Sequence, residues 1–162
     1  MNRPDRVTWW VLTFGGCGAS PFAPGTCGSL AAIAIGALLY GMVQGPYLFP
    51  SLALIASALL VLMGKRIEPI FGGKDPGAIV IDEVAGQWLA LSFLPLVGGG
   101  PVPFICAFLL FRAFDVLKPF GIKLLEGFPD GWGVLLDDLA AGALAGLTLW
   151  GGWTLFADQV AS

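Results

Sequence analysis

The stretch CGSLAAIAIGALLYGMV, residues 27–43, and the stretch YLFPSLALIASALLVLMG, residues 47–64, decide the fold class. Neither contains a charged residue. Each approaches the roughly 20 apolar residues that an α-helix needs to cross a bilayer. A third uncharged run extends from Leu139 to Ala157. The three runs predict membrane-spanning helices.

Two shorter apolar runs, Val84 to Val97 and Pro101 to Phe111, lie between them. These two reach spanning length only if their polar ends are included. The sequence therefore predicts an all-α, polytopic membrane bundle of about five transmembrane helices, which forms a single membrane-embedded domain over residues 1–162. No small-residue cleavage site follows a basic start, so we expect no cleaved signal peptide.

The composition excludes several classes of protein. The chain is 57% hydrophobic and only 12% charged, which is far from the balance of soluble domains. Its net charge of −3 offers no basic surface for nucleic acid, so no nucleic-acid partner is expected. There is no histidine, and Cys17, Cys27 and Cys106 show no paired spacing, which argues against zinc and disulfides.

The charges gather on one predicted face. With five helices in order, the connections at 44–50 and 98–103 share one side and carry no charge. An odd number of spans places Asp158 on that side too, so ten of the eleven acids share the opposite face with the bases. The positive-inside rule makes this opposite face cytoplasmic. It receives every basic residue: Arg3, Arg6, Lys65, Arg66, Lys74, Arg112, Lys118 and Lys123.

Small residues recur at spacings of four at Gly28, Ala32 and Gly36, and again at Gly142 and Gly146. This pattern lets membrane helices approach closely. We expect packing within the chain, with a homo-oligomer as the alternative.

Two segments of mixed character, Lys65 to Phe71 and Val116 to Phe128, follow apolar runs. They predict short additional helices, the second lying at the membrane interface with its apolar side among the lipid headgroups.

The run IVIDEVAGQW, residues 79–88, carries the acidic pair Asp82 and Glu83 directly after an apolar approach. Ionisable groups at membrane depth are costly and usually functional. The alternative is that Asp82 simply caps a helix, which an Asp at its start does well. A helix cap requires only one carboxylate, so capping by Asp82 would leave Glu83 unexplained.

In FRAFDVLKP, residues 111–119, Arg112 and Asp115 are three apart and share a helix face. They could form an ion pair and nothing more. Lys118 adds a second cation just before a proline. Two cations of this kind suit a phosphoryl group, to which arginine offers bidentate hydrogen bonds.

The run GWGVLLDDLAAG, residues 131–142, places Asp137 and Asp138 a few residues inside the last helix. Adjacent helical residues diverge by about 100°, so the two cannot point into the same place. We expect one to bind a metal while its neighbour orients another group, and we expect the same division between Asp82 and Glu83.

The Gly/Pro-rich entrance TFGGCGASPFAPGTCGSL, residues 13–30, leads into the first long helix near Thr26 and Ser29. Free N–H groups at a helix start favour an anion. The segment matches neither the phosphate-loop nor the dinucleotide motif. We include this segment in the candidate site because it is predicted to lie on the same membrane face as the acids.

Five carboxylates would repel one another at one site unless a cation joined them. They come from three helices and are the candidate catalytic and metal-binding residues: Asp82, Glu83, Asp115, Asp137 and Asp138. Oxygen ligands without histidine or paired cysteine favour Mg²⁺ or Mn²⁺ over zinc. Such an ion would polarise a phosphate and position its attacker.

The runs GASPFAPGTCGSLAA, IVIDEVAGQW, FRAFDVLKPF and GVLLDDLAAG together resemble phosphatidylglycerophosphatase A of bacteria, over about Phe14 to Gly146. The resemblance implies an all-helical, Mg²⁺-dependent enzyme of the inner membrane. It would remove the terminal phosphate of phosphatidylglycerophosphate, giving phosphatidylglycerol and inorganic phosphate. The family pattern falls on Pro24, Gly25 and Thr26 and on these charged residues: Asp82, Glu83, Arg112, Asp115, Lys118, Asp137 and Asp138.

The predicted mechanism has the lipid entering from the cytoplasmic leaflet, with its phosphate held by Arg112, Lys118 and the helix start at Thr26 and Ser29. Mg²⁺ sits among the acids, and one carboxylate activates water or attacks phosphorus. A phosphotransferase for CDP-activated lipids is the enzyme alternative, but its signature of acids on one helix is absent. An ion-transport subunit is the other alternative, although transport sites tend to lie near mid-membrane.

Overall fold

The computed structural model describes residues 3–73, 76–127 and 132–161. Within these ranges the chain is helical and contains no strand, which confirms the all-α prediction. The elements in order are α1 (Arg3–Leu12), η1 (Cys17–Ala19), α2 (Pro24–Met42), α3 (Leu48–Met63), η2 (Gly64–Arg66), α4 (Ile67–Phe71), α5 (Ile81–Leu91), α6 (Leu94–Val97), α7 (Pro101–Leu117), η3 (Pro119–Gly127) and α8 (Trp132–Ala161).

Three helical stretches are long and apolar enough to cross a membrane: Pro24–Met42, Leu48–Phe71 and Trp132–Phe156. They contain most of the three long uncharged runs of the sequence. The predicted count of about five is not confirmed. The fourth and fifth candidates fall short because α5 has 11 residues, or about 16 Å of helix, and α7 has 17.

The run from Val84 to Val97 does not form one helix. It is divided between α5 and α6, with the break at Ser92 and Phe93. Pro95 explains the break because it has no N–H to donate to the carbonyl of Leu91, four residues earlier.

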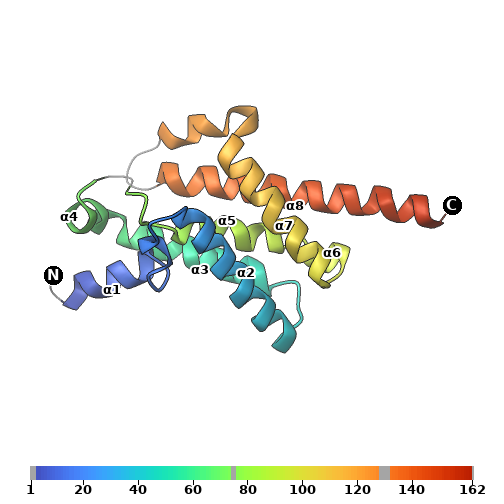
Figure 1. Ribbon diagram of the computed structural model, residues 1–162, viewed down its shortest axis with the longest axis horizontal. Coiled ribbons are helices and arrows are strands. Elements are labelled where there is room, and N and C mark those ends of the chain that lie inside the picture. Colours follow the sequence, from blue (N-terminus) through green and yellow to red (C-terminus); the bar gives the residue numbers. More distant parts are fainter. Residues whose placement is uncertain (1–2, 74–75, 128–131, 162) are drawn as a thin grey trace.

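Helix α5 occupies the centre of the bundle, among α2, α3, α7 and α8 (Figure 1). Nine of its eleven residues are buried, including Val84 and Ala85 with no exposed surface. The indole Nε1 of Trp88 donates a hydrogen bond to the carbonyl of Ala32, 3.0 Å away, which ties α5 to α2. A short helix buried this completely can carry polar groups that no lipid touches.

The small residues serve packing inside the chain. A Cβ at Gly142 in α8 would overlap the carbonyl oxygen of Gly86 in α5, and a Cβ at Gly146 would overlap the ring of Phe93. In α2, Gly28 lies against Val80 in the same way. These contacts confirm the prediction of close helix approach within the chain.

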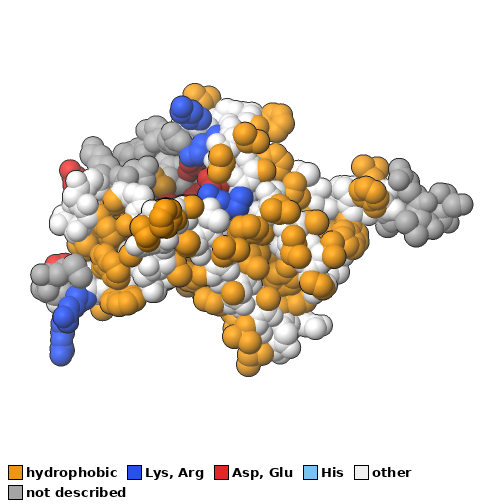
Figure 2. All heavy atoms as spheres, viewed as in Figure 1, with side chains coloured by type: hydrophobic (Ala, Val, Ile, Leu, Met, Phe, Trp, Pro, Cys, Tyr) orange, Lys and Arg blue, Asp and Glu red, His pale blue; other side chains and the backbone are white. Residues whose placement is uncertain are grey.

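The two ends of the bundle differ in charge. The uncharged turn before α7 lies against the end of α2, because Gly99 touches Tyr40 and the rings of Tyr40 and Phe104 are 5.9 Å apart. Figure 2 shows the charged side chains of the visible face toward α1 and η3, while the rest of the described part of that face carries hydrophobic and uncharged side chains. On this face the charges are therefore grouped together.

The predicted interfacial segment corresponds to the end of α7 and to η3, and its last residue, Phe128, lies outside the described residues. Phe120 and Leu124 are 89% and 82% exposed, whereas Ile122 is buried. The backbone at Phe120 and Gly121 is not helical, with φ of 58° and 82°, so η3 is interrupted by a kink. Its exposed apolar side chains still suit a position at the membrane interface.

Candidate active site

The candidate site lies where four helix ends meet: the starts of α2, α5 and α8 and the end of α7. Val80, just before α5, donates a backbone hydrogen bond to Leu12 at 3.0 Å. A Cβ at Gly18 would overlap the carbonyl oxygen of Ala78, so the glycine-rich entrance lies directly on the segment that leads into the acidic pair. Ala23 has a positive φ of 43° immediately before α2.

Three carboxylates come together at the centre of the site. Asp82 and Glu83 from α5 and Asp138 from α8 offer oxygen atoms that all lie within 4.8 Å of one another. Asp82 and Asp138 are only 2% and 4% exposed. One oxygen of Glu83, Oε2, is buried without a hydrogen-bond partner among the described residues.

Asp82 is not the N-cap of α5. Val80 holds that position, and the helix start has no side-chain cap. Asp82 is the second residue of the helix, and its Oδ1 accepts a hydrogen bond from the amide of Glu83 at 3.1 Å. The capping interpretation therefore does not account for this carboxylate.

The two acidic pairs behave differently. Asp137 and Asp138 diverge as helical spacing predicts: Asp137 pairs with Lys118, and Asp138 joins the three-carboxylate cluster. For Asp82 and Glu83 the geometry shows no such separation, because oxygen atoms of both lie in the cluster. The division of roles between these two stays a prediction.

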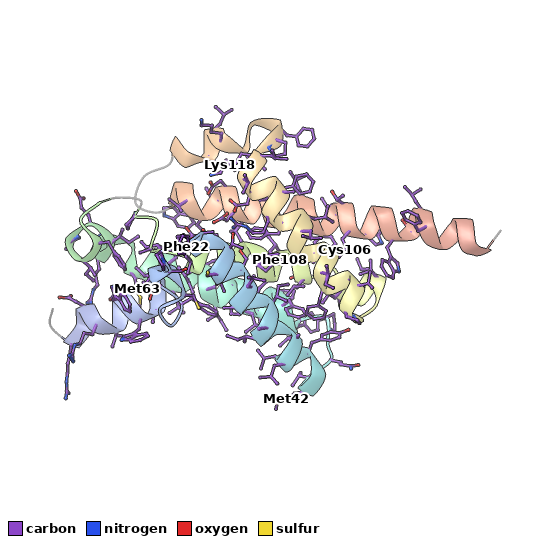
Figure 3. All side chains as sticks on the ribbon, in the orientation of Figure 1. Phe22, Met42, Met63, Cys106, Phe108 and Lys118 are labelled. Carbon is purple, nitrogen blue, oxygen red and sulfur yellow. The ribbon has the colours of Figure 1, made fainter. Side chains whose placement is uncertain are left out.

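Arg112 and Lys118 each have an acidic partner. Nη1 of Arg112 lies 2.6 Å from Asp115 in α7, so the ion pair that the sequence left open as an alternative is formed. The same Nη1 reaches the hydroxyl of Ser29 at 3.5 Å, and Ser29 donates to the carbonyl of Gly25 at 2.9 Å. Lys118, labelled at the end of α7 in Figure 3, forms an ion pair with Asp137 at the start of α8.

Arginine carries five donors and lysine three. The contacts of Arg112 with Asp115 and Ser29 use only Nη1, so its other N–H groups can donate to an anion. Thr26 is half-buried in the first turn of α2. That helix start has Pro24 in its first turn and no side-chain cap, which leaves backbone N–H groups facing outward.

The surroundings of Gly25 explain why glycine occupies the middle position of the Pro-Gly-Thr turn. A Cβ at this position would overlap Oε1 of Glu83 and would lie 3.4 Å from Nη1 of Arg112. The start of α2 thus lies directly on the carboxylate and the guanidinium. The sequence shows a glycine here, but only the packing shows which groups need the space.

Gln87 was not identified from the sequence as a site residue. It is fully buried in α5, and its side-chain nitrogen and oxygen both lack a partner among the described residues. It follows Glu83 by four residues, so it lies on the same helix face. A glutamine inside an otherwise apolar helical run was the signal that could have revealed it.

The carboxylates of the cluster lie close together and away from solvent, with Asp82 and Asp138 almost completely buried. Burial and like charge both disfavour the ionised form of a carboxylate. Three carboxylates this close cannot all be ionised unless a cation compensates them.

The donor set fits a hard divalent cation. The cluster supplies only carboxylate oxygens, which Mg²⁺ prefers. The orphaned Oε2 of Glu83 is a buried acceptor of the kind that metal binding would satisfy. Asp115 pairs with Arg112 and also lies beside the Asp138 carboxylate, at the edge of the cluster, while Asp137 pairs with Lys118.

An all-helical chain with membrane-length helices and a buried carboxylate cluster beside two cations has the features of an integral membrane phosphatase. The chain belongs to the phosphatidylglycerophosphatase A family, whose family model matches residues 10–153. All four motifs of the site lie within this range.

Relatives in two bacteria support the assignment, and a third relative carries a different name. The chain is 37% identical over 128 residues to the phosphatidylglycerophosphatase A of Haemophilus influenzae, covering 76% of this chain and 74% of that protein. It is 33% identical over 148 residues to the protein of the same name in Escherichia coli, covering 90% and 81%. It is also 38% identical over 151 residues, covering 88% and 91%, to a Bacteroides thetaiotaomicron protein provisionally named phosphatidylinositol-3-phosphatase. No solved structure matches the chain.

Proposed function

We propose that this protein removes the terminal phosphate of phosphatidylglycerophosphate, in a reaction that depends on Mg²⁺. The observation that carries the proposal is the buried cluster of Asp82, Glu83 and Asp138 beside Arg112, in a chain of this family. The products are phosphatidylglycerol and inorganic phosphate, as in phospholipid biosynthesis.

Asp82, Glu83 and Asp138 would hold the metal ion. When bound there, Mg²⁺ supplies charge stabilisation for the phosphoryl oxygens and lowers the pKa of a bound water. This assignment is narrower than the five acids expected from the sequence. Asp115 and Asp137 would act by orienting Arg112 and Lys118, with which they form ion pairs.

The protein's other polar groups would bind and orient the phosphate. Arg112 lies beside the cluster and can donate two parallel hydrogen bonds to phosphoryl oxygens. Lys118 and the amides at Thr26 would supply further donors, and Ser29 positions Arg112 through its hydroxyl.

Hydrolysis can follow one of two routes from this arrangement. In the first, a carboxylate takes a proton from water, the water oxygen attacks phosphorus, and the phosphorus–oxygen bond to glycerol breaks. The leaving glycerol oxygen then takes a proton. In the second route, a carboxylate oxygen attacks phosphorus, the phosphorus–oxygen bond to glycerol breaks, and the leaving glycerol oxygen takes a proton. Water then hydrolyses the acyl phosphate, which restores the carboxylate and releases inorganic phosphate. Rapid quenching of the enzyme with phosphorus-labelled lipid distinguishes them, because only the second route leaves label on the protein.

The charge distribution supports a location in the bacterial inner membrane with the site at the cytoplasmic face. In this proposal α5 with α6, and α7, complete a five-pass arrangement with α2, α3 and α8. Contact between Gly99 and Tyr40 supports it, because it brings the turn before α7 to the same end as the turn after α2. The chain would act as one membrane-embedded unit.

Phosphatidylinositol 3-phosphate is the second candidate substrate. It is favoured by the Bacteroides thetaiotaomicron relative, over 91% of whose length the match extends. Both lipids carry a phosphate monoester that a cluster of this kind could hydrolyse. Comparing kcat/KM for the two lipids under identical conditions decides between them.

The decisive test measures phosphate release from phosphatidylglycerophosphate in detergent micelles, with Mg²⁺ and with EDTA. We expect release only with Mg²⁺, and we expect Asp82→Asn to reduce kcat/KM by at least about 100-fold. Glu68→Gln is the matched control because it neutralises an exposed carboxylate in α4. Failure of folded wild type to release phosphate from this lipid, or full release in EDTA, would refute the proposal.

A further inference from the structure

Gln87 is a buried polar side chain in α5 that the proposed mechanism does not use. It has no exposed surface, and neither its side-chain nitrogen nor its side-chain oxygen has a hydrogen-bond partner among the described residues. Within the same described ranges, one further buried side-chain atom lacks a partner, and it is Oε2 of Glu83 in the same helix. Buried polar groups in folded proteins are nearly always hydrogen-bonded, so these unpaired atoms require an explanation.

The neighbours of Gln87 fix the rotation of α5 at this point. The backbone at Gly86 lies on α8, where an added Cβ would stand 2.5 Å from the carbonyl oxygen of Asp138. On the following residue, the indole of Trp88 donates to the carbonyl of Ala32 at 3.0 Å. The side chain between these two contacts is held inside the bundle. Protein cores accept apolar swaps of similar volume, so leucine or methionine would fill this position without leaving unpaired polar atoms.

Gln87 and Glu83 are close enough to interact. They are four residues apart in α5, which places their Cβ atoms about 5–6 Å from each other on one helix face. Long side chains in a helix point toward its N-terminus, so the Gln87 side chain covers the turn that carries Glu83. The amide nitrogen is a donor and the carboxylate oxygen is an acceptor. Rotation of side-chain torsion angles is therefore enough to join the two unpaired atoms.

We propose that Gln87 is a positioning residue for Glu83, an inference that rests on the proposed function. When the cluster holds a cation, Nε2 of Gln87 donates a hydrogen bond to Oε2 of Glu83 and fixes the orientation of this carboxylate. A carboxylate oxygen has two lone pairs, so Oε2 can accept this bond and also bind the cation. Carboxylates that bind metals are commonly oriented by such hydrogen bonds. This role explains why a polar side chain occupies a position where an apolar one would be more stable.

Binding of Mn²⁺ to the full-length protein in detergent tests this role without any substrate. The electron paramagnetic resonance signal of free Mn²⁺ falls when the ion binds, which gives the Kd directly. We expect Gln87→Met, which keeps the length of the side chain but removes its amide, to raise the Kd roughly 10- to 100-fold. Gln87→Asn keeps an amide but is one methylene shorter, so it should weaken Mn²⁺ binding as well.

Leu91→Met is the matched control for Gln87→Met. Leu91 is fully buried on the same face of α5, one turn farther from the acids, and its replacement should leave the Kd unchanged. In EDTA, Gln87→Met should melt at least as high as wild type, because it removes two unpaired polar atoms. Weaker Mn²⁺ binding by an equally stable protein is a result that a role in packing alone would not give.

The outcomes separate this inference from the proposed function. An unchanged Kd in Gln87→Met, or an equal rise in Leu91→Met, would refute the positioning role even if wild type releases phosphate with Mg²⁺. Gln87-dependent Mn²⁺ binding by a wild-type protein that releases no phosphate from phosphatidylglycerophosphate would refute the proposed function and leave the positioning role standing.

Discussion

The side chain of Glu83 contacts several different parts of the candidate site. Its carboxylate reaches Asp82 and Asp138, its Oε1 lies against the backbone at Gly25, and its Oε2 is buried without a partner among the described groups. An unsatisfied buried acceptor costs about 1–3 kcal/mol unless something binds it. This cost is consistent with a carboxylate kept for function.

Gly25→Ala should lower activity more than stability. The added Cβ would overlap the end of the Glu83 side chain and not a backbone atom, so Glu83 must move while the fold remains. We expect kcat/KM to fall roughly 10- to 100-fold, as for groups that orient metal ligands. Gly41→Ala is the control, since it lies in the same helix with no atom within 4 Å of the new Cβ. Equal kcat/KM for the two variants would show that Gly25 leaves no special space for Glu83.

Gln87→Leu should make the protein more stable and less active. Leucine removes two buried polar atoms that lack partners, which should raise the free energy of unfolding by about 1–3 kcal/mol. If the amide serves the site, phosphate release should fall roughly tenfold, a trade of activity for stability. Denaturation in detergent and the phosphate assay measure the two effects.

Ser92→Ala is the comparison for Gln87→Leu. The Ser92 hydroxyl already donates to the carbonyl of Trp88 at 3.0 Å, so its loss should not stabilise the protein. Unchanged activity of Gln87→Leu would assign Gln87 to packing alone.

At the scale of elements, the contact between α5 and α8 brings the acids together. Gly86 and Gly142 let these helices approach until backbone lies on backbone, and a Cβ at Gly86 would meet the carbonyl oxygen of Asp138. The contact between α5 and α8 and the carboxylate cluster therefore depend on each other, because the same turn of α8 contributes residues to both.

Gly142→Ala should separate α5 from α8. The new Cβ would overlap the Gly86 carbonyl, and neither backbone can yield without moving a helix. Overpacking of this kind typically costs about 1–3 kcal/mol, so we expect earlier thermal unfolding together with lost activity. Gly151→Ala, in the same helix but with open space, should be neutral or stabilising by up to about 1 kcal/mol. Similar melting temperatures for the two variants would contradict the close-approach argument.

At the scale of the whole molecule, charged and apolar surfaces are separated on the visible face. The ends of the chain lie toward opposite ends of the long axis (Figure 1), and the charged groups of the visible face gather toward α1 and η3 (Figure 2). This arrangement suits an enzyme that meets an anionic headgroup at one membrane face while its remaining surface contacts lipid tails.

Cysteine labelling tests the proposed topology. In a variant with the three native cysteines changed to serine, a membrane-impermeant maleimide should reach Gly45→Cys and Gly100→Cys from outside intact cells. It should reach Lys123→Cys only after permeabilisation. Labelling of Gly45→Cys but not Gly100→Cys from outside would support a topology of three membrane passes and contradict one of five. Labelling of Lys123→Cys in intact cells would show that the orientation is opposite to the one proposed.

Much of the fold and of the site could be predicted from the sequence because the relevant signals are local. Uncharged runs of spanning length identified α2, α3 and α8, and the spacing of Arg112 and Asp115 placed the two on one helix face, where they form an ion pair. The break between α5 and α6 was missed, because Pro95 interrupts a run that hydrophobicity alone reads as continuous.

By itself, the sequence determined that this is an all-helical membrane protein with its charges at one end, since composition and the order of charged residues do not depend on packing. Only the tertiary structure decided that Asp82, Glu83 and Asp138 meet while Asp115 and Asp137 pair with cations. Distances between side chains on different helices depend on how closely the backbones approach. That approach is decided by the contacts of Gly25, Gly86 and Gly142 with residues distant in the sequence.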